Sequence, residues 1–351
     1  MFLVEKKSFF VGCAFSSLLI GLLSVCINFI LPFALLIVVI SCAVVFIIKN
    51  QWTNRISKEV FVVSLDKKIS KLKAGVDKNS NIVLDYLRSC IYDSLFFTGA
   101  NIGNAYTKLP DFQYKYRKQW IEERFALSAR FREIGIEKAC PEVAFFRHGL
   151  ISCDSAILDY IKTRDIFDLG AYVGDSALIL SEYTDRTVFS FELSNKNAEQ
   201  FRQNIGRSGI KNVVLIESGV SDHCEDVKIN DTGQSNTGIC GRGTETVKLT
   251  TVDDEAMRLH ANVGFIKADL EGFGLKMIRG AINTIKQHRP VISIGIYHNY
   301  EELFEIKPFL EEHVTNYEFK FQLHSFSEGK FVDLSLFCYP QEVLANGTNG
   351  L

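Results

Sequence analysis

Hydrophobic and polar residues are arranged along this chain in three ways, and each arrangement predicts a different kind of structure. Residues 8–48 form one apolar run without any Asp, Glu, Lys, Arg or His. Residues 51–140 mix charged and apolar positions at helical spacing. Residues 141–340 alternate short β-rich runs with helical stretches, which is typical of a parallel sheet wrapped by helices.

The apolar run would be about 60 Å long as a single helix, roughly twice the thickness of a bilayer core. It divides at residues 28–32, because the proline there lacks a backbone donor and favours the start of a helix. We therefore expect residues 1–50 to form a transmembrane hairpin of two apolar helices. Lys6 and Lys7 flank one end and Lys49 the other, so the positive-inside rule places both ends, and the catalytic part, in the cytoplasm.

Two alternatives for this run stay open. A cleaved signal peptide has an apolar region of about 7 to 15 residues followed by a small-residue cleavage site, which describes this stretch poorly. A helix pair buried in a soluble core normally carries a polar stripe, and this run has none.

Residues 51–140 are predicted to form a helical segment, because apolar residues recur among charged ones at helical spacing. Packing of this segment on the following domain is the default expectation. It could instead cover the substrate or lie near the lipid surface. The apolar residues that mark it most clearly are Trp120, Ile121, Phe125, Leu127 and Phe131.

Seven β-rich runs predict the strands of the sheet in residues 141–340. Five of them precede or follow helical stretches, as parallel strands do: 165–169, 187–191, 213–216, 263–268 and 291–296. The last two, 318–323 and 334–339, are predicted to form an antiparallel hairpin that closes the sheet. Residues 230–243, rich in Gly, Ser, Thr and Asn, are expected to be a loop between two extra short strands, and residues 341–351 a flexible tail.

Apolar residues at helical spacing predict helices between these strands. One helix begins within residues 176–181, and another, marked by Ala198, Phe201 and Ile205, ends near Gly206. A third ends before Pro290 and is marked by Leu275, Ile278, Ile282 and Ile285.

Composition narrows the possible partners. A net charge of -2 and a pI near 6.4 give no general attraction for nucleic acid, so none is expected as a partner. The nine cysteines are scattered singly, so neither a CxxC metal pair nor a dense disulfide framework is predicted. A reducing compartment fits this cysteine usage best, and no metal ligands are predicted.

A glycine loop follows the first predicted strand, at the carboxyl edge of the sheet where open α/β sheets bind small molecules. A dinucleotide loop has the pattern G-x-G-x-x-G and aims backbone amides at phosphates, whereas this loop has two glycines four positions apart and two aspartates. Carboxylates repel phosphates but attract the ammonium and sulfonium of S-adenosylmethionine. The predicted cofactor contacts in the loop are Asp168, Gly170, Ala171, Gly174 and Asp175.

Two further groups complete the predicted cofactor site. Glu192 ends the second strand, 24 positions after Asp168, close to the roughly 20 expected for an acid that binds ribose hydroxyls. After the third strand, Gly219 and Asp222 occupy the position of the adenine edge, where Asp222 would accept from the adenine amino group. For Asp222 an ordinary exposed turn is an equal alternative.

The fourth predicted strand carries three ionisable residues, Lys267, Asp269 and Glu271, although central parallel strands are almost wholly apolar. Ionisable residues in such a buried strand need either a partner of opposite charge or a functional role. The carboxylates at the strand end are expected to lie over the ligand. The alternative is that Lys267 pairs with a carboxylate as a buried ion pair.

Four segments, DLGAYVGDSAL, FELSNKN, IKADLEGFGLKMIRGA and RPVISIGIYHNYEELFEI, together resemble the FkbM family of S-adenosylmethionine-dependent methyltransferases. PEVAFFRHGL, just upstream, strengthens the resemblance, which covers about residues 141–340. It implies a class I methyltransferase fold: a Rossmann-like, mostly parallel seven-stranded sheet with a C-terminal antiparallel hairpin. Members of the family are associated with O-methylation of sugar hydroxyls and of polyketide-type products.

Carried over by position, the resemblance implies cofactor contacts at Asp168, Gly170, Gly174 and Glu192. It also implies a substrate-side cluster of Lys267, Asp269, Glu271 and His298. Two positions depart from the family pattern. Gly274 stands where a second acid is usual, which weakens any mechanism that needs a second carboxylate or a metal there. Leu193 stands where proline is usual, which should matter little.

Methyl transfer to an alcohol requires that the acceptor oxygen be aligned and lose its proton. His298 directly follows the fifth strand and an imidazole titrates near neutrality, so His298 is the predicted general base and Asp269 the second candidate. His148 and Tyr297 are further candidates for the acceptor pocket, with simple packing as their alternative.

The sequence thus predicts a membrane-anchored methyltransferase that uses S-adenosylmethionine to methylate a hydroxyl of a glycan or related small-molecule acceptor, with the bilayer as the partner of its hairpin. Two rivals stay open. An NAD-dependent oxidoreductase or epimerase can be built on the same kind of sheet. A non-catalytic membrane adaptor with this fold is the other, which Gly274 makes plausible. The oligomeric state is not predicted.

Overall fold

A computed structural model describes residues 63–96, 108–137, 139, 141–233, 243–326 and 333–347. The predicted transmembrane hairpin, residues 1–50, lies outside these residues and stays a prediction. Within the described residues, none of the helices combines the length and the apolar character needed to cross a bilayer.

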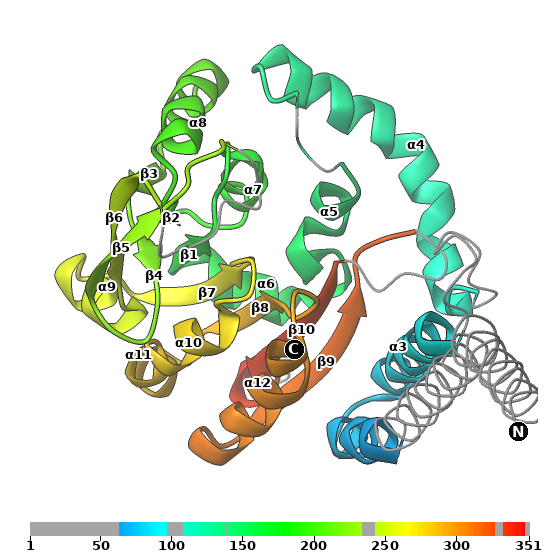
Figure 1. The fold of residues 1–351 in the computed structure, drawn as a ribbon. Coiled ribbons are helices and arrows are strands. Elements are labelled where there is room, and N and C mark those ends of the chain that lie inside the picture. Colours follow the sequence, from blue (N-terminus) through cyan, green and yellow to red (C-terminus); the bar gives the residue numbers. More distant parts are fainter. Residues whose placement is uncertain are drawn as a thin grey trace, which may run out of the picture. The chain divides into compact units, whose positions relative to one another are not determined.

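The sheet predicted from residues 141–340 has seven strands in the order β3-β2-β1-β7-β8-β10-β9 (Figure 1). All neighbouring pairs are parallel except those made by β10, which runs antiparallel to β8 and β9. This confirms the predicted class I methyltransferase-like fold with its C-terminal hairpin. The strands are β1 (Asp165–Leu169), β2 (Val188–Phe191), β3 (Val213–Ile216), β7 (Val263–Ala268), β8 (Val291–Gly295), β9 (Tyr317–Leu323) and β10 (Leu334–Pro340).

The central strands are buried because helices cover them. Every residue of β1, β7 and β8 is buried, as expected for parallel strands with both faces covered. Figure 1 shows α8 near the β3 edge and α12 near the β9 edge. The covering helices are α6 (Ser155–Lys162), α7 (Asp175–Leu180), α8 (Asn195–Ser208), α9 (Val252–Arg258), α10 (Gly274–Arg279), α11 (Ile282–His288) and α12 (Tyr300–His313).

A second, three-stranded sheet has the order β4-β6-β5. Its strands are β4 (Gly219–Val220), β5 (Glu225–Ile229) and β6 (Glu245–Thr250). The expectation of two extra short strands around residues 230–243 is therefore confirmed, while residues 234–242 of that loop lie outside the described part of the chain.

The helix predicted to end before Pro290 is two helices, α10 and α11, so this expectation was wrong. They are separated at Gly280, whose backbone packs so closely that an added Cβ would lie 2.1 Å from the carbonyl oxygen of Ser221. The predicted flexible tail was also wrong in part, because α13 (Glu342–Gly347) is helical and its Val343 is buried in the core.

The predicted helical segment is helical where it is described: residues 63–73, α3 (Lys78–Phe96) and α4 (Asp111–Glu133). It packs on β9, the last strand of the sheet, as expected by default. The backbone N–H of Phe321 donates to Ser80 Oγ at 2.9 Å, and the Gln113 side chain donates to the carbonyl of Leu323 at 2.8 Å. These bonds satisfy backbone groups of an edge strand that would otherwise be open to pairing. Residues 65–351 consequently form one compact unit.

The connection from α4 to the sheet passes through α5 (Pro141–Phe146) and the short 3₁₀ segment η3 (Arg147–Ser152). α5 packs against α4 and α7. This connection therefore brings the PEVAFFRHGL segment next to the carboxyl edge of the sheet.

Candidate active site

The glycine loop between β1 and α7 has a backbone that only glycine adopts easily at two positions. Gly170 has φ +77°, and a Cβ there would lie 2.1 Å from the carbonyl oxygen of Asp269. Gly174 has φ +93° and is the N-cap of α7. Ala171 between them is fully buried, and its N–H donates to the Phe191 carbonyl at 2.9 Å. The loop thus presses against the ends of β2 and β7, which places it where the sequence predicted a ligand.

Asp168 lies inside this edge of the sheet, with no exposed surface. Its Oδ2 accepts from the hydroxyls of Ser176 at 2.8 Å and Ser190 at 3.2 Å. Lys267 Nζ lies 3.2 Å from Asp168 Oδ1 and donates to the Gly170 carbonyl at 2.7 Å. Burial opposes the charge of Lys267, but the carboxylates around it outweigh burial and raise its pKa.

This pairing decides between the two possibilities for Lys267. The structure contains the buried ion pair, in which Lys267 is paired with Asp168. The ammonium of Lys267 therefore pairs with Asp168 and holds the glycine loop, while its predicted place among the catalytic residues stays a prediction.

Glu192, at the end of β2, is almost completely buried beside the loop. Its carboxylate accepts from the backbone N–H of Tyr172 at 2.9 Å and of Ser194 at 2.8 Å. Burial raises the pKa of Glu192 to about 7, although these hydrogen bonds act in the opposite direction. Burial also raises the pKa of Asp175, at the start of α7, to about 6.

The segment predicted to meet the adenine edge joins β3 to the small sheet. Gly219 is buried in β4, where a Cβ would lie 2.6 Å from a methyl group of Leu249. Asp222 accepts from the Ser221 hydroxyl at 3.1 Å and contacts His223 at 2.7 Å. Its carboxylate thus has partners of its own, as in the turn that was the alternative, and its adenine contact stays a prediction.

Asp269 follows β7 directly and stands across from the glycine loop, since its N–H donates to the Leu169 carbonyl at 3.1 Å. The Tyr297 hydroxyl lies 3.2 Å from both oxygens of the Asp269 carboxylate. His298 Nε2 lies 3.0 Å from Oδ1. Burial favours the neutral acid, but the contacts with His298, Lys267 and Tyr297 outweigh it, so the pKa of Asp269 is lowered. The carboxylate is therefore ionised and held in one orientation.

The imidazole of His298 lies between two carboxylates, those of Asp269 and Glu302. On the side opposite Asp269, its Nδ1 lies 3.1 Å from Oε2 of Glu302, a residue of α12 with a 1% exposed side chain. Burial lowers the pKa of His298, but the contacts with Asp269 and Glu302 outweigh this and raise the pKa to about 10. His298 is therefore an imidazolium at neutral pH. Its Nδ1 is hydrogen-bonded to Glu302, and its Nε2 contacts Asp269 as an ion pair without hydrogen-bond geometry.

Glu302 also explains how the chain accommodates Gly274. The other carboxylate oxygen of Glu302 accepts the Gly274 N–H at 2.7 Å, and a Cβ on Gly274 would lie 2.7 Å from that oxygen. A carboxylate from α12 thus occupies the space beside Gly274, where the family pattern has an acidic side chain. Glu302 was missed at the sequence level, where its spacing of four from His298 on a helix was the available signal.

Glu271 lies at the edge of this cluster. Its backbone has φ +49°, its side chain is 38% exposed, and its carboxylate is 3.9 Å from His298 Nε2. Burial raises the pKa of Glu271. Its side chain is thus about as exposed as that of Asp269, at 39%.

A small cavity of about 20 Å³ opens beside Asp269, large enough for one water or hydroxyl group. The predicted acceptor residues His148 and Tyr297 both line it. His324, Asp333 and Ser335 of the β9–β10 hairpin also line the cavity and were not predicted. Polar residues at the ends of two strands were the only signal for them. The lining residues are Val143, His148, Lys267, Ala268, Asp269, Ser293, Gly295, Tyr297, His324, Asp333 and Ser335.

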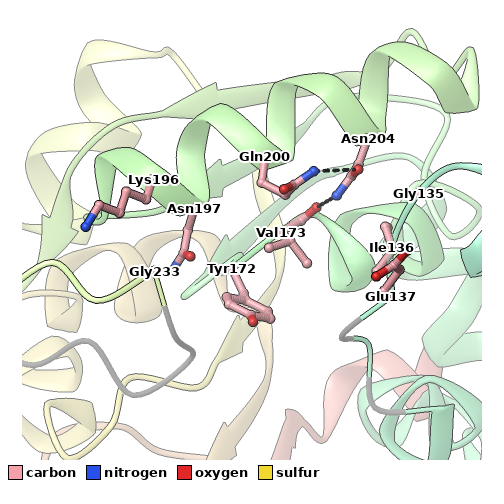
Figure 2. Close-up of a pocket in the computed structure, with 10 residues that line it drawn as sticks. All are labelled: Gly135, Ile136, Glu137, Tyr172, Val173, Lys196, Asn197, Gln200, Asn204 and Gly233. Atoms are coloured by element: carbon pink, nitrogen blue, oxygen red, sulfur yellow. Dashed lines mark hydrogen bonds between the residues drawn. The ribbon is translucent and has the colours of Figure 1, made fainter.

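A larger cleft of about 400 Å³ lies on the other side of the glycine loop, between α8 and the residues that follow α4 (Figure 2). In the close-up, Gln200 donates to Asn204, and Asn204 donates to the Val173 carbonyl at 2.8 Å. These amides therefore hold the loop in place. The lining residues are Gly135, Ile136, Glu137, Tyr172, Val173, Lys196, Asn197, Gln200, Asn204 and Gly233.

Comparison with known proteins gives a family for this part of the chain. Residues 168–326 match the family model of the methyltransferase FkbM domain. This confirms the resemblance predicted from the sequence and the prediction of an S-adenosylmethionine-dependent methyltransferase. Comparison with curated proteins gives no match.

Several solved structures are similar to the chain at low identity. Methyltransferase FkbM from Methylobacillus flagellatus KT has a TM-score of 0.42 and 15% identity, over 64% of this chain and 60% of that chain. Precorrin-6y C5,15-methyltransferase from Geobacter metallireducens GS-15 has a TM-score of 0.33 and 14% identity, over 52% and 85%. An rRNA methylase from Streptococcus thermophilus has a TM-score of 0.34 and 11% identity, over 53% and 92%.

Proposed function

We propose that the protein transfers a methyl group from S-adenosylmethionine to a hydroxyl of a glycan or related acceptor. The premise is that residues 168–326 match the methyltransferase FkbM domain. The observation that carries the proposal is the position of Asp269. Its ionised carboxylate stands at the end of a central strand, faces the glycine loop, and borders a cavity of hydroxyl size.

The residues around the loop fit S-adenosylmethionine. When bound, this compound supplies a methyl group on a positively charged sulfur. Gly170 and Gly174 would let the backbone approach the ligand closely. Glu192 would accept from the ribose hydroxyls, and Gly219 and Asp222 would flank the adenine. Since Lys267 neutralises Asp168, the negative charge that favours a cationic donor over a dinucleotide comes from Glu192 and Asp269.

The geometry favours a role for His298 that differs from the predicted general base. Because its two nitrogens are engaged by Asp269 and Glu302 and its pKa is raised to about 10, it has no free lone pair at neutral pH. Its positive charge instead keeps Asp269 ionised and fixed. Asp269 then aligns the acceptor by accepting a hydrogen bond from its hydroxyl.

A hydroxyl-rich acceptor suits the cavity, because hydroxyl, carboxylate and imidazole groups line it. With only about 20 Å³ available, the cavity admits the reacting hydroxyl and leaves a sugar ring outside. The apolar residues 8–48 support an acceptor at the cytoplasmic face of a membrane, since anchoring raises the effective concentration of a membrane-bound substrate.

The full chain, purified in detergent, tests the proposal in two steps. Calorimetry should detect binding of S-adenosylmethionine and no saturable binding of NAD; the reverse result would point to an oxidoreductase or epimerase. Methyl-labelled S-adenosylmethionine should then label a membrane-glycan extract, and Asp269→Asn should abolish this labelling. Cofactor binding without labelling of any acceptor would favour the non-catalytic adaptor.

A further inference from the structure

His148 is held at the acceptor cavity by an unusual backbone turn. Three consecutive residues, Arg147, His148 and Gly149, have positive φ values of 51°, 52° and 94°. Two of them are not glycine, and left-handed conformations of such residues cost free energy and cluster at functional sites. Gly149 has no room for a side chain, because a Cβ would lie 2.4 Å from the Gln322 side chain. The turn therefore fixes the direction in which His148 leaves the backbone.

The imidazole of His148 is buried and unpaired. Its residue is only 9% exposed and lines the cavity together with Asp269 and Tyr297. Within the described part of the chain, no hydrogen bond or ion pair engages its ring nitrogens. A ring nitrogen without a partner in a residue that lines this cavity can accept a hydrogen bond from a ligand hydroxyl.

The other two histidines near Asp269 are already engaged. His298 contacts carboxylates with both nitrogens. His324 contacts the Gln322 side chain at 3.2 Å and the Ser335 hydroxyl at 3.3 Å. Of the three imidazoles, His148 alone has no hydrogen-bond or ion-pair partner within the described part of the chain.

We propose that His148 is the catalytic base that removes the proton of the acceptor hydroxyl. This proposal rests on the methyltransferase function proposed above. The acceptor oxygen forms its bond to the methyl carbon with its own lone pair. The bond between that carbon and the donor sulfur breaks, and its electron pair stays on the sulfur. As the methyl group is transferred, the O–H hydrogen bond shifts from Asp269 to a ring nitrogen of His148, which takes the proton. Asp269 then stabilises the resulting imidazolium.

The charges around the cavity agree with this role. Burial, Lys267 and His324 hold the pKa of His148 well below its usual value, while Asp269 acts in the opposite direction. Asp333 and Tyr297 also face the cavity; burial raises the pKa of Asp333 to about 6 and keeps Tyr297 protonated. His148 therefore carries a free lone pair at neutral pH.

Three variants of the full chain test the proposal. His148→Asn removes the base with a residue that tolerates the left-handed backbone, and turnover of the membrane-glycan extract should fall about 100-fold or more. His313→Asn is the control, which removes an imidazole that does not line this cavity and should change turnover less than about tenfold. In His148→Ala, added imidazole should restore turnover with a dependence on pH, which a purely structural role of His148 would not produce. Calorimetry should show unchanged S-adenosylmethionine binding in all three.

Histidine ¹⁵N NMR adds a readout that does not depend on activity. The His148 signals, identified by their absence from His148→Asn, should be those of a neutral imidazole at pH 7, and those of His298 should be cationic. A charged His148, or His148→Asn turnover within threefold of the wild type, would overturn the assignment of the base. A wild-type chain that binds S-adenosylmethionine but methylates nothing would refute the proposed function and, with it, the catalytic role of His148.

Discussion

Lys267 Nζ lies 3.2 Å from Asp168 Oδ1, and this ion pair joins two central strands, β7 and β1, behind the glycine loop. Both side chains are almost completely buried. Removing one partner of a buried pair leaves an uncompensated charge, which typically costs about 3–5 kcal/mol.

We therefore expect Lys267→Met to lower the free energy of unfolding by about 3–5 kcal/mol, measured by urea denaturation. The double variant Lys267→Met with Asp168→Asn should recover much of this loss, because the uncharged amide oxygen that replaces the Asp168 carboxylate would still accept from Ser176 and Ser190. A double variant no more stable than Lys267→Met would show that the ion pair is not the source of the effect.

The glycine loop gives a second prediction, with an internal control. Gly170→Ala should destabilise the protein by at least about 1–3 kcal/mol, because alanine disfavours φ +77° and its Cβ would meet the Asp269 carbonyl. Gly206→Ala should instead stabilise it by about 0.5–1 kcal/mol, since Gly206 lies in α8 with nothing within 4 Å of the added Cβ. Urea denaturation measures both, and equal effects would contradict the proposed strain at Gly170.

His298 predicts how stability changes with pH. Its pKa is about 10 in the folded protein, above the value of about 6.5 in the unfolded chain. Its contribution to stability is therefore fully present below pH 6.5 and is lost as pH rises toward 10. We expect the melting temperature to fall across this range more steeply in the wild type than in His298→Asn. Glu302→Gln should give an intermediate slope, because it removes one of the two carboxylate partners of the imidazolium.

Glu192 predicts how cofactor binding changes with pH. Its carboxyl has a pKa of about 7, and only the ionised form attracts a cationic donor and accepts from both ribose hydroxyls. Calorimetric affinity for S-adenosylmethionine should therefore increase between pH 6 and 8, and Glu192→Gln should bind weakly with little dependence on pH. Asp175, with a pKa of about 6, titrates in the same range, so Asp175→Asn is the control that should keep the increase. An equally steep increase in Glu192→Gln would rule out Glu192 as its cause.

Most of the sheet could be predicted from the sequence, because strand identity depends on local pattern. The runs at 165–169, 213–216 and 263–268 match β1, β3 and β7 residue for residue. The break between α10 and α11 could not be predicted in this way. The apolar spacing continues through Gly280, the C-cap of α10, where the backbone packs against Ser221, a residue far away in the sequence.

By itself, the sequence determined which residues stand at the carboxyl edge of the sheet, because strand ends and glycine turns are encoded by neighbouring residues. It thereby placed Asp168, Glu192 and Asp269 at one site. Only the tertiary structure decided which charged partner each of these site residues has. Lys267 pairs with Asp168, and Glu302 reaches His298 from α12. The physical reason is that the pKa of a buried group depends on partners and burial contributed by distant elements, which no local pattern specifies.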